Sequence, residues 1–244
     1  MNSWREKSGA ESETMKILDV AQRSVEWMQA RAGIPTASEF DQLVTPDFKI
    51  RTGEMPKSYI AKKLAEAWLG GPLPAFNSFD MDQGNILEEE AIPWYELEFG
   101  ATIQRVGLIT TNDGRIGCSP DGLLKYGGIE IKCPLVQTHI GYLLAGELPK
   151  QYAVQVYGSM FVSGLPRWTF VSYHRRLPAL HLIIERNAAI QSAIAFALDE
   201  FLERFDRGMK RLEELNGGPP RRPAPMRPET SPAMNDRELD VPIP

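Results

Sequence analysis

A turn followed by a β-hairpin constrains the fold of this chain more than any other stretch. Asp121 sits in a Ser-Pro-Asp-Gly turn, where Pro presets one backbone angle and Gly permits the unusual one. A tight connection at residues 126–128 then leads into a strand over 129–133 with strict alternation of apolar and polar residues. Because side chains two apart on a strand share a face, Glu130 and Lys132 point together toward Asp121, while the apolar side chains enter a core.

These three charged side chains indicate a metal site. Two carboxylates and one amine on one face are costly unless something offsets their charge, and a hard divalent cation held by carboxylate oxygens would do so. Taken alone, Glu130 and Lys132 describe a strand with a solvated outer face, and an Asp in such a turn is ordinary. Their joint occurrence on one hairpin favours a site.

Composition places the chain among soluble globular proteins. Its 244 residues, 43% hydrophobic and 24% charged, suffice for a sizeable core. No apolar run reaches the roughly 18 residues of a membrane helix, and no signal region begins the sequence. Two Cys predict a reducing cytoplasm and exclude a four-Cys zinc or iron–sulfur site within the chain. A net charge of −5 argues against a protein that simply coats nucleic acid, but is compatible with a local basic groove.

The sequence predicts one folded domain between two loose ends. Residues 1–18 are polar and patternless, and Met15 offers an alternative start to Met1. Residues 216–244 contain eight prolines and no periodicity, which is typical of a disordered tail. The folded domain is expected over 19–215.

Within this domain we expect an α/β fold with a central mixed sheet and helices on both sides. Pro93 should break or kink the helix that begins at Phe79. Asn187 should cap a long final helix with a continuous apolar stripe. The expected helices are 23–32, a short one from 36, one from about 56 to 69, 79–92, 136–145, 149–162 and 187–215, and the further strands are 101–110, 167–173 and 180–185.

The most basic stretch is 49–63, which carries five Lys or Arg residues against one acid. Its lysines could line a DNA groove. For any single Lys, however, a solvated helix face is the more common explanation.

The motif of the first hairpin resembles a known signature. Pro120-Asp121 followed by Glu130-Ile131-Lys132 is similar to the PD-(D/E)xK nuclease motif. The longer strings Ser-Pro-Asp-Gly and Glu-Ile-Lys-Cys-Pro resemble the phage lambda exonuclease (YqaJ-type viral recombinase) family of that superfamily. The resemblance implies a restriction-endonuclease-like core.

It also implies a Mg²⁺ site with one or two ions, for which Mn²⁺ can substitute. By this likeness Asp121, Glu130 and Glu88 are the metal ligands, with the Ile131 carbonyl as an additional ligand. Glu88 lies four residues after Gly84, and positions four apart share a helix face, which would leave room beside the carboxylate.

Two further side chains are assigned to catalysis. Lys132 would orient or deprotonate the attacking water, and a Lys acting as a base needs a lowered pKa. In the family a Gln lies near this Lys, and the resemblance carries that role onto Gln155.

A second group of residues resembles the family's pocket for a terminal 5′ phosphate. Arg31 supplies a forked set of donors and Ser38 a hydroxyl donor, and Ser119 is assigned to substrate binding with them. A surface Arg and a helix cap are the ordinary alternatives for the first two.

The resemblance implies an exonuclease that digests the 5′ strand of duplex DNA, releasing 5′ mononucleotides and leaving 3′ single-stranded tails. No phosphate-binding loop of an ATPase is present, so digestion would need no ATP. Relatives form ring-shaped trimers around DNA and work with a single-strand annealing protein, which we expect here in a bacterial cytoplasm. The alternatives are a sequence- or structure-specific endonuclease of the superfamily, a non-catalytic module that binds DNA ends, and an accidental motif match.

Overall fold

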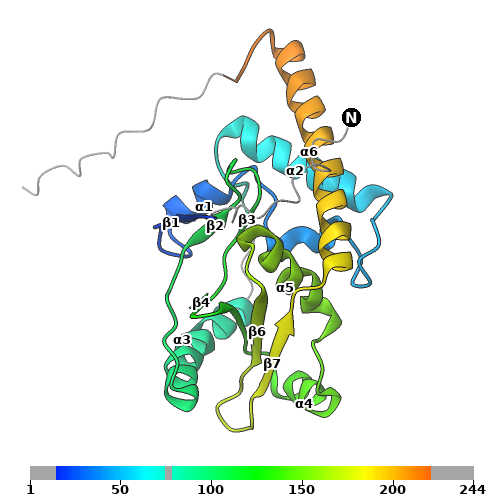
Figure 1. Ribbon diagram of the computed structural model, residues 1–244. Coiled ribbons are helices and arrows are strands. Elements are labelled where there is room, and N and C mark those ends of the chain that lie inside the picture. Colours follow the sequence, from blue (N-terminus) through cyan, green and yellow to red (C-terminus); the bar gives the residue numbers. More distant parts are fainter. Residues whose placement is uncertain (1–14, 75–78, 221–244) are drawn as a thin grey trace, which may run out of the picture.

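A four-stranded mixed sheet lies at the centre of the computed structural model, which describes residues 15–74 and 79–220, with side chains outside 79–86 (Figure 1). Its outer strands pair antiparallel with their neighbours, and its two middle strands run parallel. The expected mixed sheet is thus confirmed. In spatial order the strands are β4 (Gly122–Leu124), β5 (Gly127–Lys132), β6 (Arg167–Ser172) and β7 (Leu180–Glu185).

The connection between β4 and β5 has two residues, 125–126, in place of the expected three, 126–128. Leu124 pairs with Gly127, so the turn is Lys125-Tyr126 and β5 begins earlier than predicted. Gly128 is the reason that β5 can lie so close to β6. A Cβ atom there would lie 2.3 Å from a ring carbon of Trp168, which is closer than any side chain tolerates.

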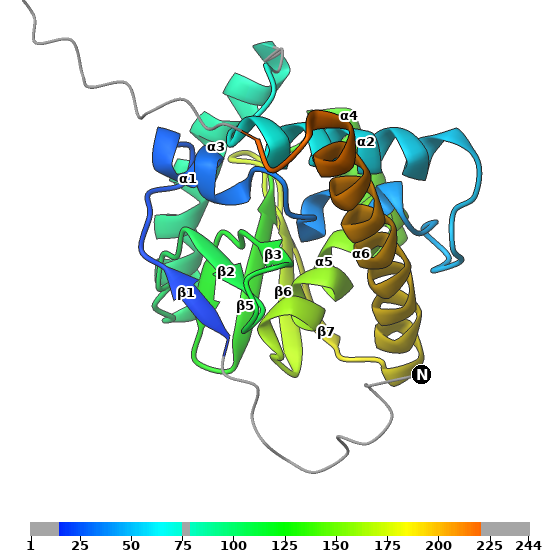
Figure 2. The same cartoon turned by 90° about the horizontal axis from the view of Figure 1, so that it is seen from above.

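Helices cover both faces of this sheet (Figures 1 and 2). Helix α3 (Phe79–Phe99) packs Ala91, Ile92 and Tyr95 over the face that bears Ile129 and Ile131. Helix α5 (Lys150–Ser163) packs over the opposite face, which bears Trp168 and Phe170. Alternate residues of β5 therefore face two different helices, as the period of a strand requires.

The parallel pair β5–β6 requires a crossover, which α4 (Val136–Ala145) and α5 provide. Both helices begin and end within one residue of the predicted limits. The final helix α6 (Ala188–Asn216) also forms as predicted, because the Asn187 side chain accepts a hydrogen bond from Ile190 N–H at its start. It packs against α5 and against α2 (Glu54–Leu69).

A second, three-stranded sheet corrects two predictions. Lys16–Leu18 forms β1, which pairs antiparallel with β2 (Leu108–Thr110), so the chain is already ordered before residue 19. The strand expected over 101–110 is confined to β2, because the residues before it cross to the main sheet through a single bridge between Gln104 and Leu123. The third strand is β3 (Gly117–Cys118).

Pro93 does not end α3. The helix continues to Phe99, although Pro removes one backbone hydrogen bond. The side chains on both sides of Pro93 are anchored in the core, and this packing favours the continued helix. Of the predicted break or kink, the break is therefore wrong.

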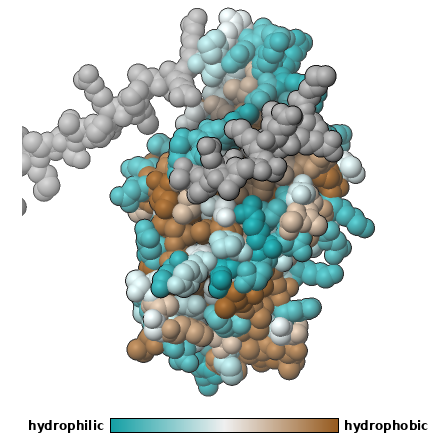
Figure 3. Space-filling view, in the orientation of Figure 1, coloured by the Kyte–Doolittle hydropathy of each residue, from teal (hydrophilic) through white to brown (hydrophobic). Residues whose placement is uncertain are grey.

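The surface is of mixed character. Figure 3 shows separate apolar areas among hydrophilic residues on one face of the molecule. Within the described ranges, no helix has the length and apolarity needed to cross a membrane. Most of the proline-rich tail, like residues 1–14, lies outside the part of the chain that the structure describes.

Candidate active site

Strand β5 and the turn before β4 bring Asp121, Glu130 and Lys132 together, as predicted. Glu130 is only 2% exposed, so the solvated strand face considered above does not exist. The Lys132 ammonium lies 2.5 Å from Glu130 Oε1. Asp121 Oδ2 accepts a hydrogen bond from Ile131 N–H at 2.5 Å, which ties the turn to the strand.

Helix α5 contributes Gln155 from the face opposite α3. Its amide nitrogen donates to Glu130 Oε1 at 2.5 Å, the oxygen that Lys132 also contacts. The structure therefore places Gln155 against the carboxylate next to Lys132. Its predicted catalytic role stays a prediction.

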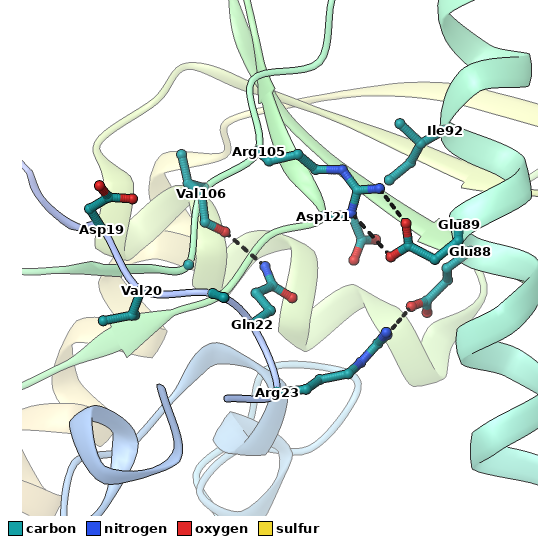
Figure 4. A pocket seen from close by; sticks show the side chains of 12 residues that line it. Asp19, Val20, Gln22, Arg23, Glu88, Glu89, Ile92, Arg105, Val106 and Asp121 are labelled. Atoms are coloured by element: carbon teal, nitrogen blue, oxygen red, sulfur yellow. Dashed lines mark hydrogen bonds and ion pairs between the residues drawn. The ribbon is translucent and has the colours of Figure 1, made fainter. Parts of the chain in front are cut away.

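Helix α3 contributes Glu88 from across a cleft (Figure 4). Arg23, in the segment before α1 (Val25–Arg31), reaches over and donates to Glu88 Oε2 at 2.6 Å. Arg23 has a φ of 68°, a left-handed conformation that is uncommon for residues other than Gly. Sequence reasoning placed Arg23 only at the start of a helix, because nothing in its neighbours signals this contact.

The cleft has a volume of about 360 Å³. Glu88 and Asp121 both line it, and Glu89 does so beside them, paired with Arg105 at 2.8 Å. Gly84, the expected neighbour of Glu88, lies outside the part of α3 whose surroundings the structure describes.

We call Glu88, Asp121, Glu130 and Lys132 the carboxylate centre. Burial raises the pKa of Glu130 to about 7, although Lys132 acts against it. Burial also raises the pKa of Asp121, and burial together with the Asp121 charge raises that of Glu88. Burial alone would lower the pKa of Lys132, but Glu130 and Asp121 outweigh it and raise it. The centre thus holds an excess of negative charge around one firmly protonated Lys.

The donor set of the carboxylate centre fits a hard divalent cation. Glu130 Oε2 is buried and has no hydrogen-bond donor among the described residues. Three carboxylates offer the oxygen ligands that Mg²⁺ prefers, and a cation would favour their ionised forms, which burial disfavours. In the form described, no three acidic, His or Cys side chains of residues 15–74 and 87–220 are grouped closely enough to hold an ion. Arg23, Lys132 and the Ile131 amide occupy their oxygens instead.

The predicted phosphate-binding residues also meet, around Arg31. One guanidinium nitrogen donates to Ser119 Oγ at 2.9 Å, and the other lies 3.2 Å from Ser38 Oγ. Two residues that the sequence did not single out for binding complete the group. Arg31 donates to Thr36 Oγ1 at 3.0 Å and stacks over the Trp27 ring at 4.3 Å, and Trp27 Nε1 donates to Ser119 Oγ at 3.0 Å. We call these five residues the Arg31 pocket.

Burial lowers the pKa of Arg31, because the guanidinium is desolvated. No carboxylate lies within ion-pair distance of it among the described side chains. A half-buried cation surrounded by hydroxyl groups loses part of its hydration, which an anion bound beside it would offset. Thr36 itself precedes the short 3₁₀ helix η1 (Ala37–Gln42), and its hydroxyl does not cap that helix.

Solved structures share the fold of this chain. Two crystal structures of LHK-Exo, an alkaline exonuclease from Laribacter hongkongensis, one of them in complex with dAMP, each have a TM-score of 0.71 and 30% sequence identity to this chain. Each comparison covers 80% of this chain and 98% of the other. A phage related exonuclease from Haemophilus somnus 129PT shares the fold, with a TM-score of 0.52 and 16% identity over 73% of this chain and 96% of that one.

The predicted restriction-endonuclease-like α/β fold is therefore confirmed. No curated protein matches the sequence significantly. The model of the YqaJ-like viral recombinase domain matches residues 26–166, which is more than half of the chain. That range includes every residue of the carboxylate centre and of the Arg31 pocket. The fold, the two groups of residues and this match together show that the chain belongs to the family of YqaJ-like viral recombinase domains.

Proposed function

We propose that this protein is a metal-dependent exonuclease that digests the 5′ strand of duplex DNA. The observation that carries the proposal is the junction of the two groups of residues. Ser119 of the Arg31 pocket and Asp121 of the carboxylate centre are separated by Pro120 alone. An anion pocket beside a carboxylate centre suits a DNA strand whose terminal phosphate is held while the next phosphodiester is cut.

The hydrogen-bond polarity of the Arg31 pocket favours a phosphate. Ser119 Oγ accepts from both Arg31 and Trp27, so its own O–H remains free to donate. Ser38 Oγ accepts from Arg31 and lies 3.4 Å from Thr36 Oγ1, so its proton can go either to Thr36 or to a ligand. The pocket therefore presents donors and a positive charge to a ligand that only accepts, as a phosphate does.

Asp121, Glu130 and Glu88 would hold one or two Mg²⁺ ions, with the Ile131 carbonyl as a further predicted ligand. Such ions neutralise a phosphodiester and stabilise the attacking and leaving oxygens of an in-line displacement. For Glu88 to serve as a ligand, Arg23 has to release it. Freed, the Arg23 guanidinium faces the cleft and can bind a phosphate of the strand.

Lys132 is best suited to donate hydrogen bonds from its protonated ammonium group. While the three carboxylates face it, its raised pKa keeps it protonated, so it can orient a water molecule or neutralise a phosphate oxygen. It can act as a base only when the carboxylate charge is offset. Gln155 holds Glu130 Oε1 and thereby supports the position of that carboxylate.

The similar LHK-Exo structure supports an end-digesting activity, because it is described in complex with dAMP, a mononucleotide. We propose the same product class here, with 3′ single-stranded tails left behind and no use of ATP. We further propose a ring-shaped homotrimer around DNA, a single-strand annealing protein as partner, and a place in the bacterial cytoplasm. These last proposals rest on the family likeness.

The test is digestion of a linear duplex labelled separately at each 5′ and each 3′ end, with Mg²⁺ and without ATP. Early release of the 5′ label as a mononucleotide, faster from a 5′-phosphorylated end, is expected. Cutting of a covalently closed circle would instead establish an endonuclease. Tight binding to ends without any Mg²⁺-dependent product would establish a non-catalytic binding module.

A further inference from the structure

Helix α2 buries a lysine behind the Arg31 pocket. Lys63 is only 3% exposed, and its ammonium lies 2.9 Å from Glu39 and 3.0 Å from Glu66. Lys62, which is half-exposed, adds a second contact of 2.7 Å to Glu39. We call these four residues the α2 ion cluster. The basic stretch 49–63 thus does not line a DNA groove with all its lysines, because Lys63 points into the protein.

Both glutamates of the α2 ion cluster bind the loop that carries the pocket. Glu66 Oε2 accepts from Gly33 N–H at 2.9 Å. Glu39 Oε2 accepts from the hydroxyls of Thr36 and Tyr59, each at 3.2 Å. The cluster therefore holds the segment between Arg31 and Ser38 at two points, Gly33 and Thr36.

The contact with Glu39 also sets the direction of a hydrogen bond inside the pocket. A hydroxyl has one proton, and Thr36 donates it to Glu39. Thr36 Oγ1 therefore turns its lone pairs toward Arg31, which can only donate. A Thr36 side chain that is released from Glu39 loses this restriction.

Charge is balanced in the α2 ion cluster, with two lysines against two glutamates. The fields of both glutamates reach the pocket: burial lowers the pKa of Arg31, whereas Glu39 and Glu66 act to raise it. Lys63 offsets these fields, so the positive charge of Arg31 remains available to a ligand. Without Lys63, a net negative charge would lie behind the site where an anion binds.

We propose that Lys63 determines the specificity of the Arg31 pocket for a 5′ phosphate, because it neutralises Glu39 and Glu66 and so keeps the pocket positive and Thr36 oriented toward Arg31. Lys63 touches neither DNA nor metal in this proposal and acts as a positioning residue. The inference rests on the function proposed above. It adds Lys63 to the residues that determine the 5′-phosphate preference, and it predicts the direction in which each substitution changes that preference.

The experiment compares kcat/KM on duplexes with 5′-phosphate and 5′-hydroxyl ends for wild type and three variants, Lys63→Met, Glu39→Gln and the double variant. The ratio of the two constants cancels the fraction of folded enzyme, because both substrates meet the same preparation. This matters because a variant that leaves buried charges unpaired loses stability. Lys57→Met on the exposed side of α2 is the matched control, since Lys57 pairs only with Glu54 among the described side chains.

Lys63→Met should lower the phosphate preference by about tenfold, and Glu39→Gln should keep or raise it, since a carboxylate is lost. The double variant, in which charge is balanced again, should recover the preference to within about threefold of wild type. Lys57→Met should leave it unchanged. A merely structural role would lower the ratio in both single variants and most in the double variant, and that outcome overturns the inference.

Two further outcomes distinguish a failure of the proposed phosphate pocket from a failure of the proposed role of Lys63. A wild type that digests both ends equally contradicts the phosphate pocket itself, and the inference falls with it. A wild type that prefers phosphate, together with Lys63→Met at the wild-type ratio, contradicts only the role of Lys63.

Discussion

The carboxylate centre and the Arg31 pocket lie next to each other but have opposite electrostatics. The centre gathers three carboxylates around one Lys, and leaves Glu130 Oε2 without a donor among the described residues. The pocket gathers hydroxyls and an indole around one half-buried Arg that has no described carboxylate partner. One region is complementary to a cation and the other to an anion, and a metal with a phosphate strand satisfies both.

The two regions are also supported differently. The carboxylate centre stands on strand β5, whose backbone is fixed by pairing on both sides. The Arg31 pocket stands on a loop that depends on side chains, chiefly Glu39, Glu66 and the lysines behind them. This difference predicts that substitutions in the carboxylate centre abolish cleavage. Substitutions around the Arg31 pocket should instead change the preference for 5′-phosphorylated ends and the stability of the protein.

The largest expected effect is that of Lys132→Ala or Asp121→Ala. Either change should lower cleavage by about a thousandfold or more, since each removes a group at the reacting phosphate. DNA binding should persist because the pocket is intact. Product release and fluorescence anisotropy of a labelled duplex would be measured side by side, and wild-type cleavage by either variant would contradict the site.

Removal of metal should affect the two regions unequally. A chelator should abolish cleavage while leaving phosphate binding in place. In thermal melts, excess Mg²⁺ should raise the Tm of wild type, because a ligand that binds the folded state stabilises it. Asp121→Asn should lose that shift, whereas Arg31→Ala should keep it; an equal Mg²⁺ shift in Asp121→Asn would place the ion elsewhere.

Strong acid should weaken the support of the pocket, because it protonates Glu39. Burial would raise the pKa of Glu39, but Lys63 and Lys62 outweigh it and lower the value from 4.5 to about 2. A carboxyl group whose pKa is lower in the folded state than in the unfolded state stabilises the fold when the pH is above its unfolded-state pKa. Here this stabilisation is about 3 kcal/mol, and it is lost as the pH falls from about 4.5 to about 2. Urea unfolding across this range should show a smaller loss for Glu39→Gln than for wild type. Parallel curves would contradict the ion cluster.

The smallest expected effect is that of Arg31→Ala on cleavage. It should reduce the preference for 5′-phosphorylated over 5′-hydroxyl ends by about tenfold, the scale of a charge-assisted hydrogen bond, with little change on hydroxyl ends. Competing digestions of the two substrates would measure it. An unchanged preference would remove Arg31 from the pocket.

Much of the fold could be predicted from the sequence, because its elements follow local rules. Helices α4, α5 and α6 each end at a glycine, and Asn187 caps the start of α6. Strands β6 and β7 are short runs rich in aromatic, aliphatic and β-branched residues. The failures lie where distant contacts decide. Helix α3 continues past Pro93 because the side chains around it pack in the core, and Lys16–Leu18 becomes a strand only because β2 is beside it.

The meeting of Asp121, Glu130 and Lys132 could be predicted for the same reason, since all three belong to one short hairpin and the turn before it. Arg23 could not be predicted, because its partner Glu88 is 65 residues away. Lys63 looks like a surface residue in sequence, and only its burial between two glutamates shows otherwise.

Under the proposed function, the short connection from Ser119 to Asp121 would set the length of the product. Two residues of chain span at most ~7 Å, which is of the order of one nucleotide step along a strand. If a terminal phosphate rests on Ser119, the bond presented to Asp121 is the next one, whatever the base. The length of the product would then be set by the covalent connection between Ser119 and Asp121, which is two peptide bonds and a proline. It would not depend on the sequence of the DNA or on the rate of digestion.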